Sequence, residues 1–501
     1  TQIMRANAAA LAFLTLAMVA GVVACGGKAS VGLPLVPNQL RAAGGSTPID
    51  HVVIVIQENR SFDNFFATFP GADGTKTGKV AKMSPDERTF CHQQGLPAIA
   101  EPTSVPLQKT DLFGAGFGKG GDFDYNADLD HIHTGFMTDR DGGKMDGFDL
   151  TGKNADGSGF PVCTYPYQYV DPSDIAPYWD IAKQYVLADH TFSSQGSGSF
   201  TGHQDLIAAG TQISSDEALI DNPSYFPWGC DANSSVRTAI IKRGSQKVYP
   251  FGGPFPCLTY STLRDLLDAK SVSWKFYAMA VQKESGCVHG DTAGIWSAFD
   301  AIKAVRYSSE WHKNVSRNSN VFFTDVSKRA LPAVSWITPD GANSDHPSEY
   351  KHALCATPGP TPVDNGPSWV ASIVNAIGQS PYWKSTAVIV VWDDWGGYYD
   401  HVAPPRLNWQ GGPGFRVPML IVSPYVKPHV DHTVYQFGSI LRFIEETWNL
   451  GSLGKNDAHS ASIGNAFDFS IAPRKFVKID SRYSQSYFLR QPPSGLPPDT
   501  E

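Results

Sequence analysis

The clearest indication of the fold class is the stretch His51-Val52-Val53-Ile54-Val55-Ile56-Gln57-Glu58-Asn59-Arg60-Ser61-Phe62-Asp63. Its residues 52–56 are all apolar and β-branched, without the alternation of a strand that has one face in water. Such a run is typical of a strand buried on both faces, in a parallel sheet between helices. It ends at Glu58 and Asn59, which therefore lie at the carboxyl end of the strand, where open α/β sheets bind ligands. Glutamate and asparagine oxygens suit a divalent cation, although a strand that simply emerges into a polar loop gives the same pattern.

Composition and charge set the broad class. The 501 residues, 42% of them hydrophobic, can build one large α/β domain or two domains. The net charge is −8 and the sequence contains no run of Lys or Arg. This balance argues against nucleic acid as the main partner.

The N-terminus has the pattern of an export signal. Arg5 precedes an apolar stretch over residues 8–24 that ends in Val22-Val23-Ala24-Cys25. This ending resembles a bacterial lipobox, which implies cleavage before Cys25 and lipidation of its sulfur. An uncleaved anchor helix and an ordinary secretory signal are the alternatives. We expect a signal peptide over 1–24, a flexible tether over 25–47, one domain over 48–490 and a loose tail over 491–501. The protein would then be exported and lipid-anchored in the bacterial cell envelope, in the periplasm or at the cell surface.

Six further cysteines suggest disulfides in an exported chain. Their spacings are long and include no CxxC pair, which disfavours a zinc-thiolate site. Cys230 and Cys257 are nearest in sequence and both lie in Pro/Gly-rich segments, so we expect them to pair. The other connectivities stay open for Cys91, Cys163, Cys287 and Cys355.

Further apolar runs predict strands whose ends carry reactive side chains. A strand at 333–337 leads to Asp345-His346, and a strand at 387–391 leads to Asp393-Asp394. A short strand at 185–189 precedes a Gly/Ser turn that contains Ser199, with a helix expected at 204–209. The carboxyl ends of such strands can converge in a doubly wound sheet. Other strands are predicted at 272–277 and 418–422, and helices at 175–185, 261–270, 367–377 and 439–448.

Residues 122–149 are predicted to form an ordered or metal-stabilised loop. They are rich in Asp and Gly and poor in β-branched residues. Aspartates in loops usually make turns, so they carry little functional weight here. His131 and His133 differ, because two side chains at i and i+2 point the same way only on an extended segment.

Four motifs in these segments resemble the bacterial phosphoesterase family, which contains C-type phospholipases and a class of acid phosphatases. They lie at 57–66 (QENRSFDNFF), 143–148 (GKMDGF), 199–203 (SFTGH) and 393–402 (DDWGGYYDHV). The resemblance implies an alkaline-phosphatase-like α/β fold. This is a three-layer sandwich with a mostly parallel central sheet, flanking helices and long loop insertions.

The resemblance also implies roles for individual residues. Glu58 and Asn59 match the family's metal-binding pair, Asp393 matches its second acidic ligand, and Asp394 stands where members often have Glu. Ser199 matches the hydroxyl nucleophile and would complete the metal shell. The implied cofactor is one divalent metal ion of unknown identity.

Histidines complete the implied site. His131 and His346 match residues that surround the phosphate, and His133, His203 and His289 are further candidates for the phosphate site. The usual Pro-Asn of the nucleophile motif is Thr201-Gly202 here, which leaves the shape of the substrate mouth open.

The implied reaction is a double displacement through a phosphoserine at Ser199. Because many phospholipase members have Thr at this position, the serine favours an acid-phosphatase-like phosphomonoesterase. The alternative is a phospholipase C-type phosphodiesterase acting on phospholipid head groups, so the substrate is a small phosphate ester or a phospholipid. A different class of function is a non-catalytic surface-binding lipoprotein.

Overall fold

The computed structural model describes most of the chain beyond residue 46. The described ranges are 47–93, 104–112, 129–152, 161–223, 228–279, 282–283, 286–289, 294–346 and 365–491. Cys25 and the predicted signal and tether lie outside them, so those predictions stay untested.

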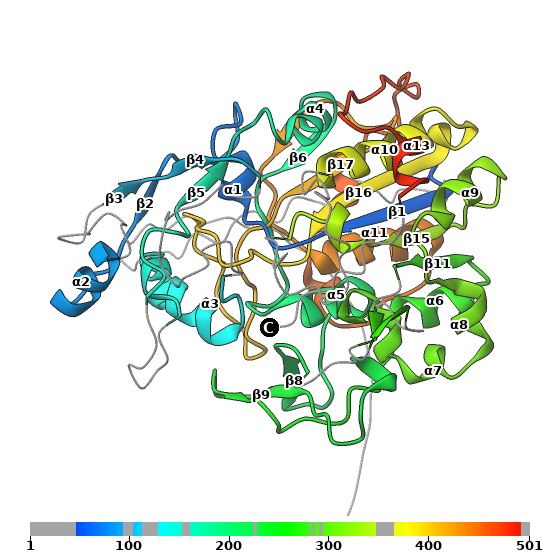
Figure 1. Ribbon diagram of the computed structural model, residues 1–501. Helices are drawn as coiled ribbons and strands as arrows, with labels where there is room; N and C mark the ends of the chain where they lie inside the picture. The colour runs from blue at the N-terminus through cyan, green and yellow to red at the C-terminus, as the bar shows by residue number, and fades with distance from the viewer. Residues whose placement is uncertain are drawn as a thin grey trace, which may run out of the picture. The chain divides into compact units, whose positions relative to one another are not determined.

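A central sheet of eight strands runs through the described part of the chain (Figure 1). Seven strands run in one direction and only β17 is antiparallel to its neighbours. In spatial order the strands are β14 (Val315–Ser316), β11 (Trp274–Tyr277), β15 (Val334–Ile337), β1 (His51–Gln57), β16 (Thr386–Trp392), β17 (Met419–Val422), β6 (Val186–Ala188) and β18 (His429–Asp431).

The predicted apolar run forms β1, in the interior of this sheet. Every side chain from Val52 to Ile56 is fully buried, as its unbroken β-branched pattern predicts. β1 pairs in parallel with β15 on one side and β16 on the other. Gln57 is in register with Trp392, so the residues that follow both strands emerge together at one edge of the sheet.

Helices cover both faces of the sheet and complete the predicted three layers (Figure 1). On one face α10 contacts α4, α9 and α13, and on the other α5 contacts α6 and α11. The first group comprises α4 (Ala176–Gln184), α9 (Val321–Ser327), α10 (Gly366–Gly378) and α13 (Gln485–Phe488). The second comprises α5 (Ser199–Ala208), α6 (Leu263–Ala269) and α11 (Phe437–Trp448).

Small elements fill the long insertions between the main strands. The helices are α1 (Phe62–Phe66), α2 (Pro85–Gln93), α3 (His133–Arg140), α7 (Lys303–Arg306), α8 (Ser309–Asn314) and α12 (Asn456–His459). The paired strands are β2 (Thr77–Lys79) with β3 (Ser104–Pro106), β4 (Gln108–Thr110) with β5 (Gln168–Val170), β7 (Thr191–Phe192) with β19 (Tyr435–Gln436), and β12 (Gln282–Lys283) with β13 (Gly286–His289). A three-stranded sheet contains β8 (Glu217–Ile220), β9 (Ala239–Lys242) and β10 (Val248–Tyr249).

Two local predictions differ from the structure. The segment predicted as a loop at 122–149 contains α3, because the sheltered side of this short helix buries His133, Phe136 and Asp139 against other segments. The helix expected at 204–209 begins five residues earlier, at Ser199. Its first turn is entirely buried, so tertiary packing supports a helix where the Gly/Ser composition predicts a turn.

Two disulfides occur among the described residues. The predicted Cys230–Cys257 pair is confirmed, with an S–S distance of 2.01 Å. A second bond joins Cys91 to Cys163, one of the connectivities that the sequence left open. It ties α2 to the turn that contains Cys163.

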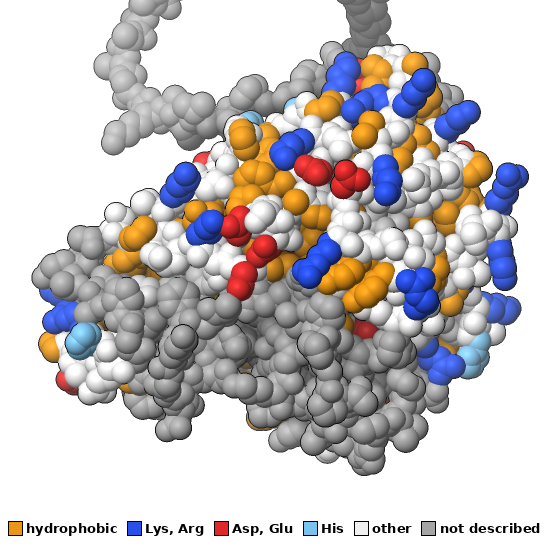
Figure 2. Space-filling model, turned by 45° about the horizontal axis from the view of Figure 1, so that its top comes forward, with side chains coloured by type: hydrophobic (Ala, Val, Ile, Leu, Met, Phe, Trp, Pro, Cys, Tyr) orange, Lys and Arg blue, Asp and Glu red, His pale blue; other side chains and the backbone are white. Residues whose placement is uncertain are grey.

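Charged and apolar side chains are interspersed on the coloured part of the face that Figure 2 displays. Figure 2 shows lysine and arginine side chains spread singly between apolar ones on the face that it displays. Within the described ranges, no helix has both the length and the apolar character needed to cross a bilayer.

Candidate active site

Three buried side chains from three elements meet at the carboxyl edge of the sheet. Glu58 follows β1, Asp393 follows β16, and His203 comes from α5. His203 Nε2 lies 3.2 Å from Glu58 Oε1 and 3.5 Å from Asp393 Oδ2. One ligand atom from each residue lies within 4.8 Å of the others, so the group can hold a metal ion.

His203 lies within the metal group, whereas the sequence predicts it only as a candidate for the phosphate site. The signal for it was present in the sequence, because Ser199 and His203 are four residues apart. On a helix this spacing puts both side chains on one face. The prediction missed the shared face because it began the helix at residue 204.

Asn59 is held against the metal group by a turn with left-handed backbone geometry, at φ 57°. Its backbone N–H donates to Asp393 Oδ1 at 3.0 Å. Its side-chain amide donates to His131 Nε2 at 3.0 Å, while His131 Nδ1–H donates to the Leu129 carbonyl at 2.6 Å. Asn59 Oδ1 is buried and accepts no hydrogen bond from the described residues.

The donor set fits a divalent cation. Burial and the negative charge of Glu58 raise the pKa of the Asp393 carboxyl well above its ordinary value. Two buried carboxylates side by side are costly unless a positive charge compensates them. Asn59 Oδ1 and the carboxylates of Glu58 and Asp393 are oxygen ligands of the kind that hard divalent cations prefer, and His203 adds an imidazole.

Ser199 and Asp394 lie beside the metal group. Ser199 is the first residue of α5, and its hydroxyl donates to Asp394 Oδ2 at 3.3 Å. Asp394 Oδ1 accepts the Gly396 backbone N–H at 2.7 Å, which fixes the carboxylate. His131 Nε2 lies 3.9 Å from Asp394 Oδ2. The structure thus gathers Ser199, Asp394 and His131 as the sequence predicts.

The two neighbouring hydroxyls of the same turn are engaged elsewhere. Ser197 Oγ accepts the Asp221 backbone N–H at 2.7 Å. The Thr201 hydroxyl donates to Ser197 Oγ at 2.7 Å. Both therefore secure the turn toward Asp221, whereas the Ser199 hydroxyl donates to a carboxylate beside the metal group.

Gly202 explains why α5 can approach β16 so closely. A Cβ atom at this position would lie 2.8 Å from the Asp393 carbonyl oxygen. Real Cβ atoms do not come so near, so any larger residue would push the helix and Ser199 away from the strand end. The departure Thr201-Gly202 from the family's usual Pro-Asn therefore has a packing role here.

The remaining predicted histidines lie at different places. The His346 ring centroid is 6.4 Å from that of His131, so these two lie close together as predicted. His133 instead points to the Gly196 carbonyl, with Nδ1 at 2.7 Å, and burial lowers its pKa. The described contacts do not bring it to the metal group. His289 ends β13, but its side chain lies outside the described residues.

Asp345, which precedes His346, has a structural environment. Its Oδ2 accepts the Tyr178 hydroxyl at 2.7 Å and the Trp392 indole N–H at 3.0 Å. Burial raises its pKa to about 7. These contacts anchor the loop that presents His346 and leave Asp345 out of the metal group.

This fold and site define a class. A mostly parallel sheet brings carboxylates, an amide, imidazoles and one hydroxyl to a single edge. This set of side chains is typical of a metal-assisted phosphoester hydrolase. The model of the Phosphoesterase family matches residues 49–451. The chain belongs to the phosphoesterase family, as its motifs predict.

Curated relatives bear names within the same class. The chain is 24% identical over 477 residues to a non-hemolytic phospholipase C of Pseudomonas aeruginosa, covering 84% of this chain and 58% of that protein. It is 23% identical over 464 residues to phospholipase C A of Mycobacterium tuberculosis, covering 86% of this chain and 79% of that protein. The chain therefore spans little more than half the length of the first relative.

Solved structures give a weaker likeness. An alkaline phosphatase superfamily protein from Vibrio parahaemolyticus aligns at a TM-score of 0.32 and 11% identity, covering 58% of this chain and 65% of that one. A lipoteichoic acid synthase from Listeria monocytogenes aligns at a TM-score of 0.32 and 9% identity, covering 63% and 73%. At these scores the family assignment rests on the sequence.

Proposed function

We propose that the protein is a phospholipase C-type phosphodiesterase that cleaves phospholipids between the glycerol oxygen and the phosphorus. The observation that carries this proposal is the similarity to named phospholipases C over more than four fifths of the chain. The acid-phosphatase prediction depended on one residue type, Ser199 in place of Thr, and it gives way to the relatives. The site retains its carboxylates and hydroxyl, which favours an enzyme over a binding lipoprotein.

In the proposed reaction Ser199 is the nucleophile. Asp394 Oδ2 accepts the hydrogen bond of the hydroxyl and is placed to hold its proton. The Ser199 oxygen bonds to phosphorus while the bond from phosphorus to the glycerol oxygen breaks. The departing glycerol oxygen takes a proton, and diacylglycerol leaves the site.

In the proposed reaction, two histidines and a metal ion assist the nucleophile. His131 positions the Asn59 amide. His346 lies close enough to His131 for both imidazoles to contact the phosphate oxygens. The head group stays on the phosphorus that is bonded to Ser199, and water then breaks the bond between phosphorus and the Ser199 oxygen and releases the phosphorylated head group. A divalent cation held by Glu58, Asn59, Asp393 and His203 would supply Lewis-acid activation and charge neutralisation.

The substrate class is tested by paired assays on one preparation. p-Nitrophenyl phosphorylcholine and phosphatidylcholine vesicles probe diesterase activity, and p-nitrophenyl phosphate probes monoesterase activity. We expect kcat/KM to be higher for the diesters and to fall to background with a chelator. Preference for the monoester would restore the phosphatase interpretation. No turnover of any of them with added divalent metals would favour a binding protein.

A further inference from the structure

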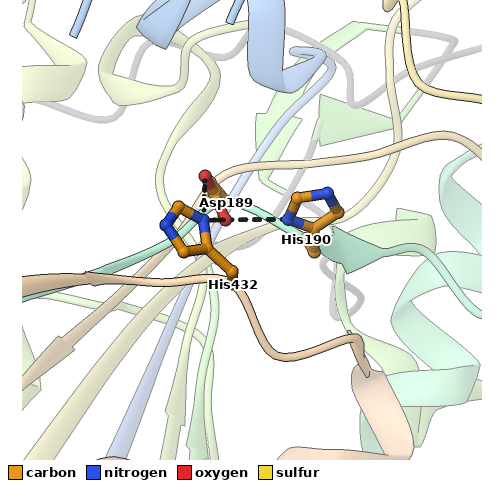
Figure 3. A group of neighbouring side chains, drawn as sticks. All are labelled: Asp189, His190 and His432. Atoms are coloured by element: carbon orange, nitrogen blue, oxygen red, sulfur yellow. Dashed lines mark hydrogen bonds and ion pairs between the residues drawn. The ribbon is translucent and has the colours of Figure 1, made fainter. Parts of the chain in front are cut away.

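A second group of side chains lies at the carboxyl ends of β6 and β18 (Figure 3). Asp189 directly follows β6, and His432 directly follows β18. The parallel register pairs the last residues of the two strands, Ala188 and Asp431. Asp189 and His432 are therefore brought together by strand pairing, although 243 residues separate them.

The side chains of this group converge on one carboxylate (Figure 3). His190 Nδ1 lies 2.9 Å from Asp189 Oδ1, and His432 Nδ1 lies 2.9 Å from Oδ2 and 3.0 Å from Oδ1. One ligand atom from each residue lies within 4.8 Å of the others. An ion with bonds of about 2.0–2.1 Å holds neighbouring ligands roughly 3–3.5 Å apart. The cluster therefore needs little rearrangement to bind one.

His190 lies between two carboxylates. Its Nδ1 faces Asp189, and its Nε2 lies 3.2 Å from Asp73 Oδ2. A neutral imidazole has only one N–H, so it can donate to only one of them. The other nitrogen then points its lone pair at a carboxylate oxygen unless a proton or a metal ion lies between. Metal-bound histidines commonly donate their second N–H to a carboxylate, which is the position of Asp73.

The carboxylate at the centre is fixed and the site is open on one side. Asp189 is fully buried, and its Oδ2 accepts the Asp73 backbone N–H at 2.8 Å. The Arg416 guanidinium donates to the Asp189 carbonyl at 2.9 Å. The His432 side chain is 60% exposed. An ion can therefore enter from solvent and keep a water ligand.

We propose that Asp189, His190 and His432 form a second metal site, for a divalent ion of the zinc class. Two imidazoles and one carboxylate suit Zn²⁺ better than Mg²⁺ or Ca²⁺, which prefer oxygen. The site is separate from the active site, because β17 lies between β6 and β16. This spacing corresponds to roughly 10 Å across the sheet. The ion would link β6, β18 and the segment around Asp73, and so stabilise the fold without entering the reaction.

Metal titration of the full chain tests the proposal, after chelator treatment and removal of the chelator. Glu58→Gln weakens the active-site metal group, His432→Ala removes a ligand of the second site, and His429→Ala is a matched control on the same strand. His429 is exposed and binds only a nearby backbone carbonyl in the described contacts. Cobalt(II) is the spectroscopic probe, since nitrogen ligands in tetrahedral geometry give it intense visible bands.

The expected results separate the two sites. Glu58→Gln alone, and Glu58→Gln combined with His429→Ala, should keep the cobalt bands and the rise in Tm that Zn²⁺ produces, and Glu58→Gln combined with His432→Ala should lose both. Asp73→Asn should weaken Zn²⁺ binding at this site about 10- to 100-fold. Hydrolysis by His432→Ala should stay near that of the wild type.

One outcome overturns the proposal. If folded His432→Ala binds Zn²⁺ with the stoichiometry and affinity of His429→Ala, the cluster holds no metal. His190 would then only connect two carboxylates by hydrogen bonds. If His432→Ala fails to fold by far-UV circular dichroism, Asp73→Asn decides instead, and unchanged Zn²⁺ affinity in that variant rejects the site.

Discussion

At the scale of single residues, the active site depends on which hydroxyl faces which carboxylate. The Ser199 hydroxyl is hydrogen-bonded to Asp394, whereas those of Ser197 and Thr201 are hydrogen-bonded to each other. The three hydroxyl groups are close in sequence, and their hydrogen-bond partners distinguish them. Substitution can therefore separate a nucleophile from residues that shape the turn.

Ser199→Ala should lower kcat by several orders of magnitude while the protein stays folded, because the covalent step loses its nucleophile. Ser197→Ala is the control, and it should reduce stability more than turnover, because it removes the acceptor of the Asp221 N–H. Acid quenching of a reaction with phosphatidylcholine should trap phosphocholine on the peptide that contains Ser199. Near-wild-type kcat in Ser199→Ala would rule out the double displacement.

Glu58→Gln should reduce metal content at the active site and activity together. The variant keeps the shape of the side chain but removes one of the buried charges that hold a cation. Metal content after dialysis and turnover of p-nitrophenyl phosphorylcholine are the measurements. Full activity of metal-stripped wild-type protein would contradict the predicted metal dependence.

At the scale of elements, the junction of α11 and α12 contains a pH-sensitive carboxyl. Burial, with a contribution from the charge of Asp457, raises the pKa of Glu445 from 4.5 to about 8. Its Oε1 accepts the Leu453 backbone N–H at 3.1 Å. The carboxyl is therefore protonated in the folded protein at pH values where the unfolded chain has released that proton.

The free energy of unfolding should consequently decrease as the pH rises from about 4.5 to about 8, since the folded state binds the extra proton. Glu445→Gln should flatten this dependence, because the amide does not titrate. Urea unfolding at about pH 5, 6.5 and 8 measures the effect, with Glu446→Gln as the control on the same helix. Parallel pH profiles for wild type and Glu445→Gln would show that the carboxyl does not contribute.

The disulfides should stabilise the insertions according to the loops they close. The Cys91–Cys163 bond spans 72 residues and the Cys230–Cys257 bond spans 27. Replacing both cysteines of the longer loop by Ala should cost about 4 kcal/mol, and slightly less for the shorter loop. Denaturant unfolding of both double variants tests the order. Equal stability to wild type in either case would indicate that the bond does not form in that protein.

At the scale of the whole molecule, we propose that the N-terminal segment outside the described residues attaches the protein to a membrane. Val22-Val23-Ala24-Cys25 predicts cleavage and lipidation at Cys25. Mass spectrometry of the protein from a bacterial host should find a diacylglyceryl cysteine at the mature N-terminus. Cys25→Ala should release the protein from the membrane fraction. An unmodified terminus elsewhere would reject the lipobox.

The sequence was sufficient to predict the central strand, the three-layer class and most of the residues that meet at the candidate active site. Val52–Ile56 specifies a doubly buried strand because it offers no polar face to water. The carboxylate and amide side chains at 58–59 and 393–394 lie where such strands end. These are local patterns, so they survive without knowledge of the neighbours.

Only the tertiary structure decided which distant groups meet. His203 joins Glu58 because buried packing starts α5 at Ser199, and Gly202 admits the helix to the end of β16. Asp189 meets His432 through the pairing of β6 with β18, which no local pattern encodes. The register of strands and the burial of a helix turn depend on the free energy of the whole core. For this reason, residues hundreds of positions apart are placed by packing rather than by their own sequence.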